Sequence, residues 1–318
     1  MMNTSVVIGI DGGGTNTRVM VCDLEGKKLA YVEGDGASSI YKDKNAVHNV
    51  RKAITDALAA ANRTTGDVRH LVAGIAGYDT PEDLSWVSEL TLLPGLDCPK
   101  LHINDAASAH AGALLGKPGI IVISGTGSII VGITESGRQI RNYDFHHYAS
   151  SAARFIAYEA VYEILAGNRD TSDKWLVEHM LHHWGAASIH EMAELSFAGF
   201  DSDKFARNKK FGDFAPFVTT AAEGGSSVAK VTCRRAAEQL KTGIEMIGSA
   251  FSTDEVEVAF IGSVITSAYL SNLLKDLLTS GNNKRYVVTS PKLKPVEGSV
   301  LLALREIGNS APITALEA

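Results

Sequence analysis

The sequence lacks the features that mark membrane, disulfide-bonded and zinc-binding proteins. No apolar run approaches the roughly 18 residues that a membrane span needs, and no basic segment precedes the short apolar run at the N-terminus. We therefore expect neither a membrane anchor nor a signal peptide. The three cysteines form no CxxC pair, which argues against a disulfide framework or a zinc ribbon and fits a reducing, cytoplasmic compartment.

The chain also lacks an excess of basic residues. It has 30 Lys and Arg against 36 Asp and Glu, for a net charge of −6. A general nucleic-acid binder would carry a basic face, so this balance favours an enzyme acting on small molecules. At roughly 150 residues per domain, the length of 318 predicts two domains.

Glycine is in modest excess, with 30 residues, and its placement is more informative than its number. Two clusters of glycine each lie between two apolar, β-rich runs, a pattern that predicts a β-hairpin. The hairpins are expected over residues 6–22 and 120–133. A shift of 111 residues superposes Gly14 on Gly125 and Thr15 on Thr126, which indicates an internal duplication, although two unrelated hairpins would also fit.

The rest of the chain alternates strand and helix patterns, as in an α/β protein. The stretch 150–251 is predicted to be mostly helical. We expect strands at 68–74, 101–104, 256–261 and 285–288, and helices at 45–61, 81–92, 106–115, 227–251, 266–278 and about 297–310.

The glycine turns have the chemistry of phosphate binding. Unlike the Rossmann and Walker loops, each lies between two strands and does not open a helix. A turn without side chains lets backbone N–H groups approach an anion, and a Thr hydroxyl adds a donor. The residues expected to bind phosphate are Gly12, Gly13, Gly14, Thr15, Asn16, Gly125, Thr126 and Gly127. Asp11, at the end of its strand, can hold Mg²⁺ through waters. The alternative is a plain hairpin turn.

Asp105 follows a short apolar strand and precedes a helix of small residues. A carboxylate at the carboxyl end of a strand faces the ligand crevice of an open α/β sheet. There it can accept the proton of a hydroxyl group during phosphoryl transfer. The alternative role for Asp105 is that of a helix N-cap.

Four segments occur in the order found in one known family: 10–17, 104–106, 123–128 and 295–299. Over its whole length the chain resembles the BadF/BadG/BcrA/BcrD ATPase family and, within it, the N-acetylglucosamine and glucosamine kinases of the sugar kinase, Hsp70 and actin superfamily. The resemblance implies a duplicated ribonuclease-H-like fold, the actin-like ATPase fold, with ATP in a cleft between two lobes. These lobes would span 1–116 and 117–296, the second with a helical insertion, and a helix at about 297–310 would pack back on the first.

The same resemblance implies roles for individual residues. Asp105 would be the catalytic base, and Asn104 and Ser39 would lie at the substrate. Gly262 and Ser263 would belong to the adenosine-binding motif. ATP and Mg²⁺ would be required, the partner would be a small-molecule sugar, and a homodimer is compatible with the family.

The chain departs from these kinases at the segments that contact the sugar. The relatives carry Gly-Asp-Glu-Gly-Ser ahead of one helix, whereas Ala149 and Ser150 stand here in place of the acidic pair, and Ser39 replaces an Asn. His146 or His147 would then supply different contacts. The resemblance implies an ATP-dependent kinase for a small sugar or amino sugar; the alternative is a nucleotide-binding sensor or ATPase with a diverged sugar site.

Two further functions are not expected. The family includes ATPases that drive electrons into acyl-CoA reductases and dehydratases through an iron–sulfur cluster held by cysteines. None of Cys22, Cys98 and Cys233 is near the second glycine turn in the sequence. Three histidines, at 179, 182 and 183, have spacings that suit a metal, but no nearby Cys or acidic pair completes a site, so an exposed or interface face is expected.

Overall fold

The computed structural model describes residues 4–37 and 44–309, and the chain divides into two compact units. The first unit comprises 1–117 and 290–318, and the second comprises 118–289. The chain therefore returns to the first unit at Ser290, whereas the sequence predicts this return at about residue 297. Ser39, a predicted substrate contact, lies outside the described residues. None of the helices in the described ranges is long and apolar enough to cross a membrane.

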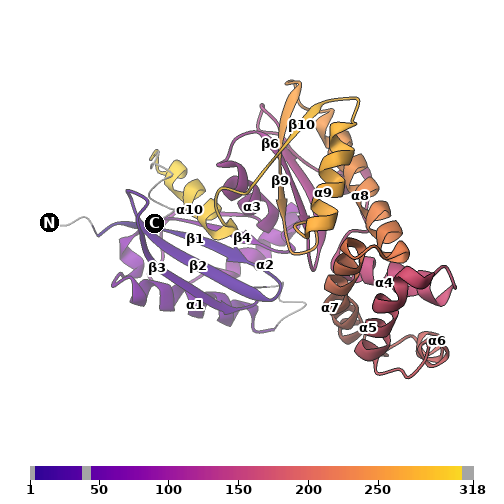
Figure 1. Cartoon of the computed structure of the whole chain (residues 1–318). Coiled ribbons are helices and arrows are strands. Elements are labelled where there is room, and N and C mark those ends of the chain that lie inside the picture. Colours follow the sequence, from indigo (N-terminus) through magenta and orange to yellow (C-terminus); the bar gives the residue numbers. More distant parts are fainter. Residues whose placement is uncertain (1–3, 38–43, 310–318) are drawn as a thin grey trace. The chain divides into compact units, whose positions relative to one another are not determined.

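The first unit is built on a five-stranded mixed sheet of order β3-β2-β1-β4-β5, in which β1 pairs antiparallel with β2 and parallel with β4 (Figure 1). Its elements are β1 (Val6–Gly12), β2 (Asn16–Asp23), β3 (Lys28–Asp35), α1 (Ala46–Ala60), η1 (Thr65–Asp67), β4 (Val68–Ile75), η2 (Pro81–Asp83), α2 (Leu84–Leu90), β5 (Lys100–Asn104), α3 (Asp105–Leu114) and α10 (Pro295–Glu306).

The second unit has a sheet with the matching order β8-β7-β6-β9-β10, in which β6 pairs antiparallel with β7 and parallel with β9. Its elements are β6 (Gly119–Ser124), β7 (Ser128–Ile133), β8 (Gln139–Arg141), η3 (Asn142–Phe145), α4 (Ala153–Leu165), η4 (Thr171–Asp173), α5 (Lys174–Trp184), α6 (Ile189–Phe197), α7 (Lys204–Glu223), α8 (Ser227–Gly248), β9 (Glu255–Ile261), α9 (Ala268–Thr279) and β10 (Arg285–Thr289).

The turns that follow the two hairpins repeat each other in detail. Between β2 and β3, the N–H of Asp23 donates to the carbonyl of Lys27 at 3.0 Å, and Gly26 has φ +82°. Between β7 and β8, the N–H of Thr134 donates to the carbonyl of Arg138 at 3.0 Å, and Gly137 has φ +80°. The shared sheet order and these turns confirm the predicted duplication and the α/β class.

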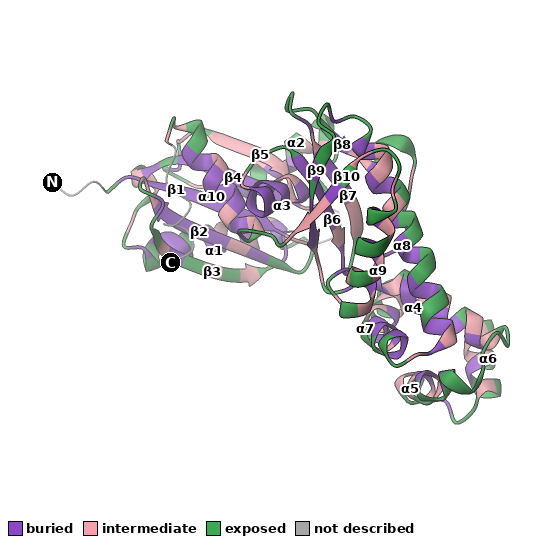
Figure 2. Cartoon of the chain, turned by 45° about the horizontal axis from the view of Figure 1, so that its top comes forward, coloured by how far each residue is buried: buried purple, intermediate pink, exposed green. Residues whose placement is uncertain are grey.

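The central strand of the first unit, β1, is buried along its whole length (Figure 2). Because side chains alternate along a strand, Ile8 and Ile10 face the core formed with α1 and α2, whereas Val7 faces α10. Gly9 also faces α10, and a Cβ there would lie 2.6 Å from the carbonyl oxygen of Val296. The helix α10 therefore lies directly against β1 where no side chain intervenes.

One buried carboxylate, that of Asp173, joins two segments of the helical part of the second unit. Asp173 accepts hydrogen bonds from the hydroxyls of Ser226 and Ser227, at 2.6 and 2.7 Å, and from the N–H of Val228 at 3.1 Å. These bonds tie η4 to the start of α8. Burial by itself raises the pKa of Asp173, but the hydrogen bonds together outweigh it and hold the pKa below its ordinary value.

The three histidines of α5 do not form a metal site. The ring of His179 stacks on Trp175 at 3.8 Å, and Nε2 of His183 bonds to the carbonyl of Lys210 at 2.8 Å, so only His182 lies on an exposed face as predicted. In the described ranges, no three His, Cys, Asp or Glu residues are grouped so that they could hold a metal.

Candidate active site

The first glycine turn is closed by a hydrogen bond from the N–H of Gly13 to the carbonyl of Asn16, at 2.9 Å. Gly12 is required by packing, since a Cβ there would lie 2.7 Å from Cδ1 of Ile75. Gly14 is exposed, and a Cβ there would meet nothing within 4 Å. Because protein packing does not demand a glycine at 14, its absence of a side chain fits the close approach of a ligand.

The second glycine turn repeats this design with one residue fewer. The N–H of Gly125 donates to the carbonyl of Gly127 at 2.9 Å. The paired ends here are Ser124 and Ser128, and only three residues separate them. Thr126 and Gly127 are exposed, and a Cβ on Gly127 would also meet nothing within 4 Å. Each turn thus has one exposed glycine at which an added Cβ would meet no protein atom.

The predicted adenosine motif lies beside the second turn, inside the same unit. Gly262 has φ +104°, in the left-handed region, and a Cβ there would lie 2.5 Å from the carbonyl oxygen of Ser124. The same oxygen accepts hydrogen bonds from the N–H groups of Val264 and Ile265, at 3.1 and 3.2 Å. Ser263, between Gly262 and Val264, is exposed. The structure thus brings 262–263 against the second turn.

The predicted base, Asp105, is the first residue of α3, directly after the carboxyl end of β5. The N-cap is Asn104, whose side-chain oxygen accepts from the N–H of Ala106 at 2.9 Å, so the alternative that Asp105 is the cap is wrong. The Asn104 amide donates to the carbonyl of Tyr78 at 3.0 Å and to the carboxylate of Asp79 at 3.2 Å. Both predicted substrate residues at this junction therefore lie at the edge where β4 and β5 end.

Burial and neighbouring carboxylates raise the pKa of Asp105. Burial is the largest cause of the rise of its pKa to about 6, and the negative charges of Asp11 and Asp79 add to it. A pKa near 6 suits a general base that works near neutral pH. Asp79 was missed by sequence reasoning, although its place just after the carboxyl end of β4 follows the same rule that singled out Asp105.

Asp11, the predicted magnesium ligand, is engaged by an arginine. Nη1 of Arg18 lies 3.1 Å from its carboxylate, and Nε of Arg18 lies 3.4 Å from Glu33. Burial still raises the pKa of Asp11, with Arg18 acting in the opposite direction. Carboxylate oxygens suit Mg²⁺, but the described residues include no protein cage for a metal, so an ion here would take most ligands from water and phosphate.

The segment 295–299, the last of the four segments that carry the family resemblance, packs against the helix that begins with Asp105. A Cβ on Gly298 would overlap the carbonyl oxygen of Ser108 and the N–H of Gly112, so α10 and α3 meet backbone to backbone. The hydroxyl of Ser299 donates to the carbonyl of Ile10 at 2.8 Å and lies 2.8 Å from that of Ser108. The segment thus fixes the helix that begins with Asp105 against β1.

The segment that departs from the kinase pattern lies against the second turn. The hydroxyl of Ser124 donates to the carbonyl of Ser151 at 2.5 Å, and the hydroxyls of Ser151 and Ser128 are 2.6 Å apart. Ala149 is buried, and the N–H of Ser150 donates to Oε1 of Gln239 at 2.6 Å. Hydroxyl groups, and no carboxylate, therefore occupy this stretch.

The two predicted histidine contacts lie on the loop after η3. His146 is exposed, with φ +55°. The ring of His147 packs against α8, where a Cβ on Gly243 would lie 3.1 Å from its Cε1. Within the part of the chain that the structure describes, no hydrogen bond or ring contact joins either histidine to 124–128.

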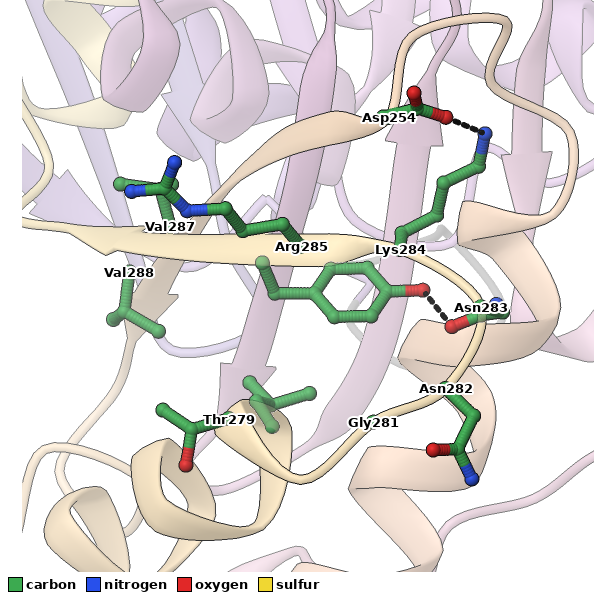
Figure 3. A pocket seen from close by; sticks show the side chains of 11 residues that line it. Asp254, Thr279, Gly281, Asn282, Asn283, Lys284, Arg285, Val287 and Val288 are labelled. Atoms are coloured by element: carbon green, nitrogen blue, oxygen red, sulfur yellow. Dashed lines mark hydrogen bonds and ion pairs between the residues drawn. The ribbon is translucent and has the colours of Figure 1, made fainter.

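A cavity of about 750 Å³ lies elsewhere in the second unit, between the end of α9 and β10 (Figure 3). Asp254 and Lys284 line it, at the amino ends of β9 and β10, whereas the second glycine turn follows the carboxyl end of β6. Because β6, β9 and β10 are parallel, this cavity lies at the opposite edge of the sheet from the turn. It is not part of the candidate site.

Comparison with known proteins agrees with this picture. The chain is 26% identical over 306 residues to the N-acetylmuramic acid/N-acetylglucosamine kinase of Clostridium acetobutylicum, covering 94% of this chain and 98% of that protein. It is 26% identical over 329 residues to the N-acetyl-D-glucosamine kinase of Dictyostelium discoideum, covering 95% and 99%.

A solved structure shows the same fold. The ROK family glucokinase of Streptomyces griseus, in complex with glucose and AMPPNP, superposes with a TM-score of 0.57 at 19% identity, over 94% of this chain and 98% of that one. The BadF/BadG/BcrA/BcrD ATPase family model matches residues 8–303. The chain belongs to the BadF/BadG/BcrA/BcrD ATPase family.

Proposed function

We propose that the protein is an ATP-dependent kinase that phosphorylates a hydroxyl group of a small sugar or amino sugar. The observation that carries the proposal is Asp105, a half-buried carboxylate with a pKa raised to about 6, at the sheet edge where β1 ends in a glycine turn. Both full-length curated relatives are named as kinases of N-acetylated amino sugars, which supports this acceptor class.

The glycine turns would bind the phosphates of ATP. A Cβ at Gly14 or at Gly127 would meet no protein atom within 4 Å, so a phosphate oxygen has room to approach the N–H groups of each turn. Mg²⁺ would be held by Asp11 through waters and by phosphate oxygens, and when bound it neutralises phosphate charge. The adenosine moiety would lie at Gly262 and Ser263.

Asp105 would position the acceptor and accept the proton of its attacking hydroxyl. The hydrogen bonds of Asn104 to Tyr78 and Asp79 fix the junction of β5 and α3, so the carboxylate is held on a rigid element. Burial, with the charges of Asp11 and Asp79 adding to it, raises the pKa of Asp105 and makes it a stronger base than an exposed Asp. The remaining acceptor contacts would come from Ser39 and from the histidines at 146 and 147.

The variant Asp105→Asn tests this assignment. Loss of the base should lower kcat by about 10³-fold, the middle of the usual range for general base catalysis, while the dissociation constant for ATP changes less than about twofold. Asp56→Asn, on the exposed face of α1, is the matched control and should behave as the unaltered protein. Turnover retained in Asp105→Asn would overturn the role of Asp105.

A second candidate is a sensor or ATPase of the same family that binds nucleotide but phosphorylates no sugar. Ala149 and Ser150 favour it, since they stand where the resembling kinases carry an acidic pair. A screen of ADP release over hexoses, amino sugars, N-acetylated sugars and polyols separates the two. Release that depends on one acceptor supports the kinase, whereas slow release that no acceptor stimulates supports the sensor. A cytoplasmic location and a homodimer belong to the proposal through family resemblance.

A further inference from the structure

Arg154 stands at the beginning of α4, next to the second glycine turn. Its Nη1 donates to the carbonyl oxygen of Thr126, at 3.3 Å. Its guanidinium carbon lies 4.3 Å from the centre of the Phe155 ring, a cation–π distance. These two contacts hold the guanidinium against the exposed part of the turn.

The start of α4 is bonded to the same turn through the backbone. The N–H of Ala153 donates to the carbonyl of Gly125 at 2.7 Å, one residue before Arg154. The hydroxyls of Ser151 and Ser128 are paired at the other side of the turn. Because the helix and the turn are joined at both points, the guanidinium keeps its place relative to whatever the turn binds.

The charge of Arg154 has no carboxylate partner in the described ranges. The acidic residues further along α4, Glu159 and Glu163, both pair with Arg235. A guanidinium carries five N–H donors, and within the described part of the chain only one of those of Arg154 is used in a hydrogen bond. A half-buried cation with free donors beside an exposed glycine turn is suited to an anion.

We propose that Arg154 donates a charge-assisted hydrogen bond to a phosphate group of the nucleotide bound at the turn 125–127. This inference rests on the proposed function, since it needs ATP at the second turn. Hydrogen bonds between a guanidinium and a phosphate are roughly twice as strong as neutral ones. The guanidinium lies at the carbonyl of Thr126, and an added Cβ on the next residue, Gly127, would meet no protein atom within 4 Å, so a phosphate oxygen has room to approach the turn there.

The test compares nucleotide binding in Arg154→Gln, Arg154→Lys and the matched control Arg234→Gln, whose arginine lies exposed on α8. Dissociation constants for ATP, ADP and adenosine are measured by titration calorimetry with Mg²⁺ present. Arg154→Gln should weaken ATP and ADP binding at least about tenfold, the usual effect of losing a bond to a charged group, and leave adenosine unchanged. Arg154→Lys should recover part of the loss, and unfolding temperatures should not differ.

Three results would overturn the inference. Equal ATP affinity in Arg154→Gln and the unaltered protein would mean that the guanidinium touches no phosphate. A raised KM for the sugar with unchanged ATP affinity would place it at the acceptor instead. A loss of adenosine affinity equal to that of ATP would indicate a general disturbance of the turn. If the unaltered protein binds no ATP at all, the proposed function itself fails, a distinct result.

Discussion

The two glycine turns have the same backbone design and opposite electrostatic surroundings. Carboxylates surround the first turn, with one arginine among them: Asp11, Asp79, Asp105 and Arg18. Hydroxyls and a guanidinium that has no carboxylate partner among the described residues surround the second: Ser124, Ser128, Ser151 and Arg154. If both turns bind phosphate as proposed, this difference implies that the duplication kept the backbone of the turn, while the side chains around it came to serve proton transfer at the first turn and charge neutralisation at the second.

The helices that pack behind the two hairpins, α10 in the first unit and α8 in the second, also meet their neighbours differently. We call these helix contacts the supports of the turns. In the first unit α10 meets α3 backbone to backbone at Gly298, so there is no flexible atom to move. In the second unit α8 approaches β7 at Gly243, where an added Cβ would meet the tip of Ile130 and the ring of His147. Side-chain tips can rotate away, whereas backbone cannot. The first turn should therefore tolerate less change in its support.

The largest effect is expected from adding one methyl group to each support. Gly298→Ala should lower the free energy of unfolding by about 3 kcal/mol, because α10 must separate from α3. Gly243→Ala should cost about 1 kcal/mol or less. Chemical denaturation of both variants measures this, with Gly66→Ala on η1 as the control, since an added Cβ there would make only an ordinary contact, 3.8 Å from the hydroxyl of Thr64. Equal losses at 298 and 243 would contradict the difference in support.

Alanine at Gly14 or Gly127, at the tips of the turns, should cost less stability than alanine at the supports but should weaken ATP binding. At Gly14 and at Gly127 a Cβ meets no protein atom, and neither residue has a positive φ, so alanine should leave the unfolding temperature unchanged. Binding should suffer, since the methyl group would occupy the space through which phosphate reaches the backbone. We expect ATP affinity to fall about tenfold in each variant, close to the value of one hydrogen bond to a charged group.

This pair of variants also tests whether the two turns act together. If Gly14→Ala weakens ATP binding and Gly127→Ala does not, the second turn is a plain hairpin turn, as the sequence alone allows. A drop in unfolding temperature for either variant would instead show that the glycine serves packing.

Much of the fold could be predicted from the sequence because its hydrophobic patterns are strong. The hairpin at 6–22 is observed, since two apolar runs flank its glycines. The helix predicted at about 297–310 is also observed, with bounds Pro295–Glu306. The predicted helix 81–92 is shorter, because Thr80 and Asp83 form a capping box around η2, and α2 begins only at Leu84. The predicted helix 227–251 ends at Gly248, where Tyr286 packs against the backbone.

The residues around the candidate site were less predictable. Asp105 could be found, since it follows a strand directly, but its N-cap turned out to be Asn104. Arg18 and Arg154 could not, because their places beside Asp11 and Thr126 depend on strand register and on a contact between distant segments. A sequence pattern reveals which backbone bends, and only tertiary contacts reveal which charges surround the bend.

The acidic surroundings of the first turn predict a dependence on pH. Asp105, with a pKa of about 6, must be ionised to act as a base, so kcat/KM should fall about tenfold per pH unit below 6. Stability should change in the opposite direction. The folded state raises this pKa from 3.8, so it favours the protonated carboxyl, and the corresponding stability is lost as the pH rises through 6.

The sign of this effect can be measured with Asp105→Asn. Above pH 7 the variant should be more stable than the unaltered protein by about 1–3 kcal/mol, because it removes a half-buried charge near Asp11. Below pH 4 the two should unfold alike. Higher stability of the unaltered protein at pH 8 would mean that the carboxylate of Asp105 is favourably paired.

The smallest effect is expected at the hydroxyl groups of the second turn. Ser151→Ala removes the partner of the Ser128 hydroxyl and leaves intact the bond from Ser124, which goes to the carbonyl of residue 151. The loss of one neutral hydrogen bond should cost about 1 kcal/mol of stability and raise the KM for ATP only about two- to threefold. Ser150→Ala is the matched control, since its side chain is exposed and only its N–H is bonded. At the first turn the comparable variant, Asp105→Asn, removes a carboxylate and should lower kcat strongly. If Ser151→Ala lowered kcat as much as Asp105→Asn, the proposed division of roles between the two turns would be contradicted.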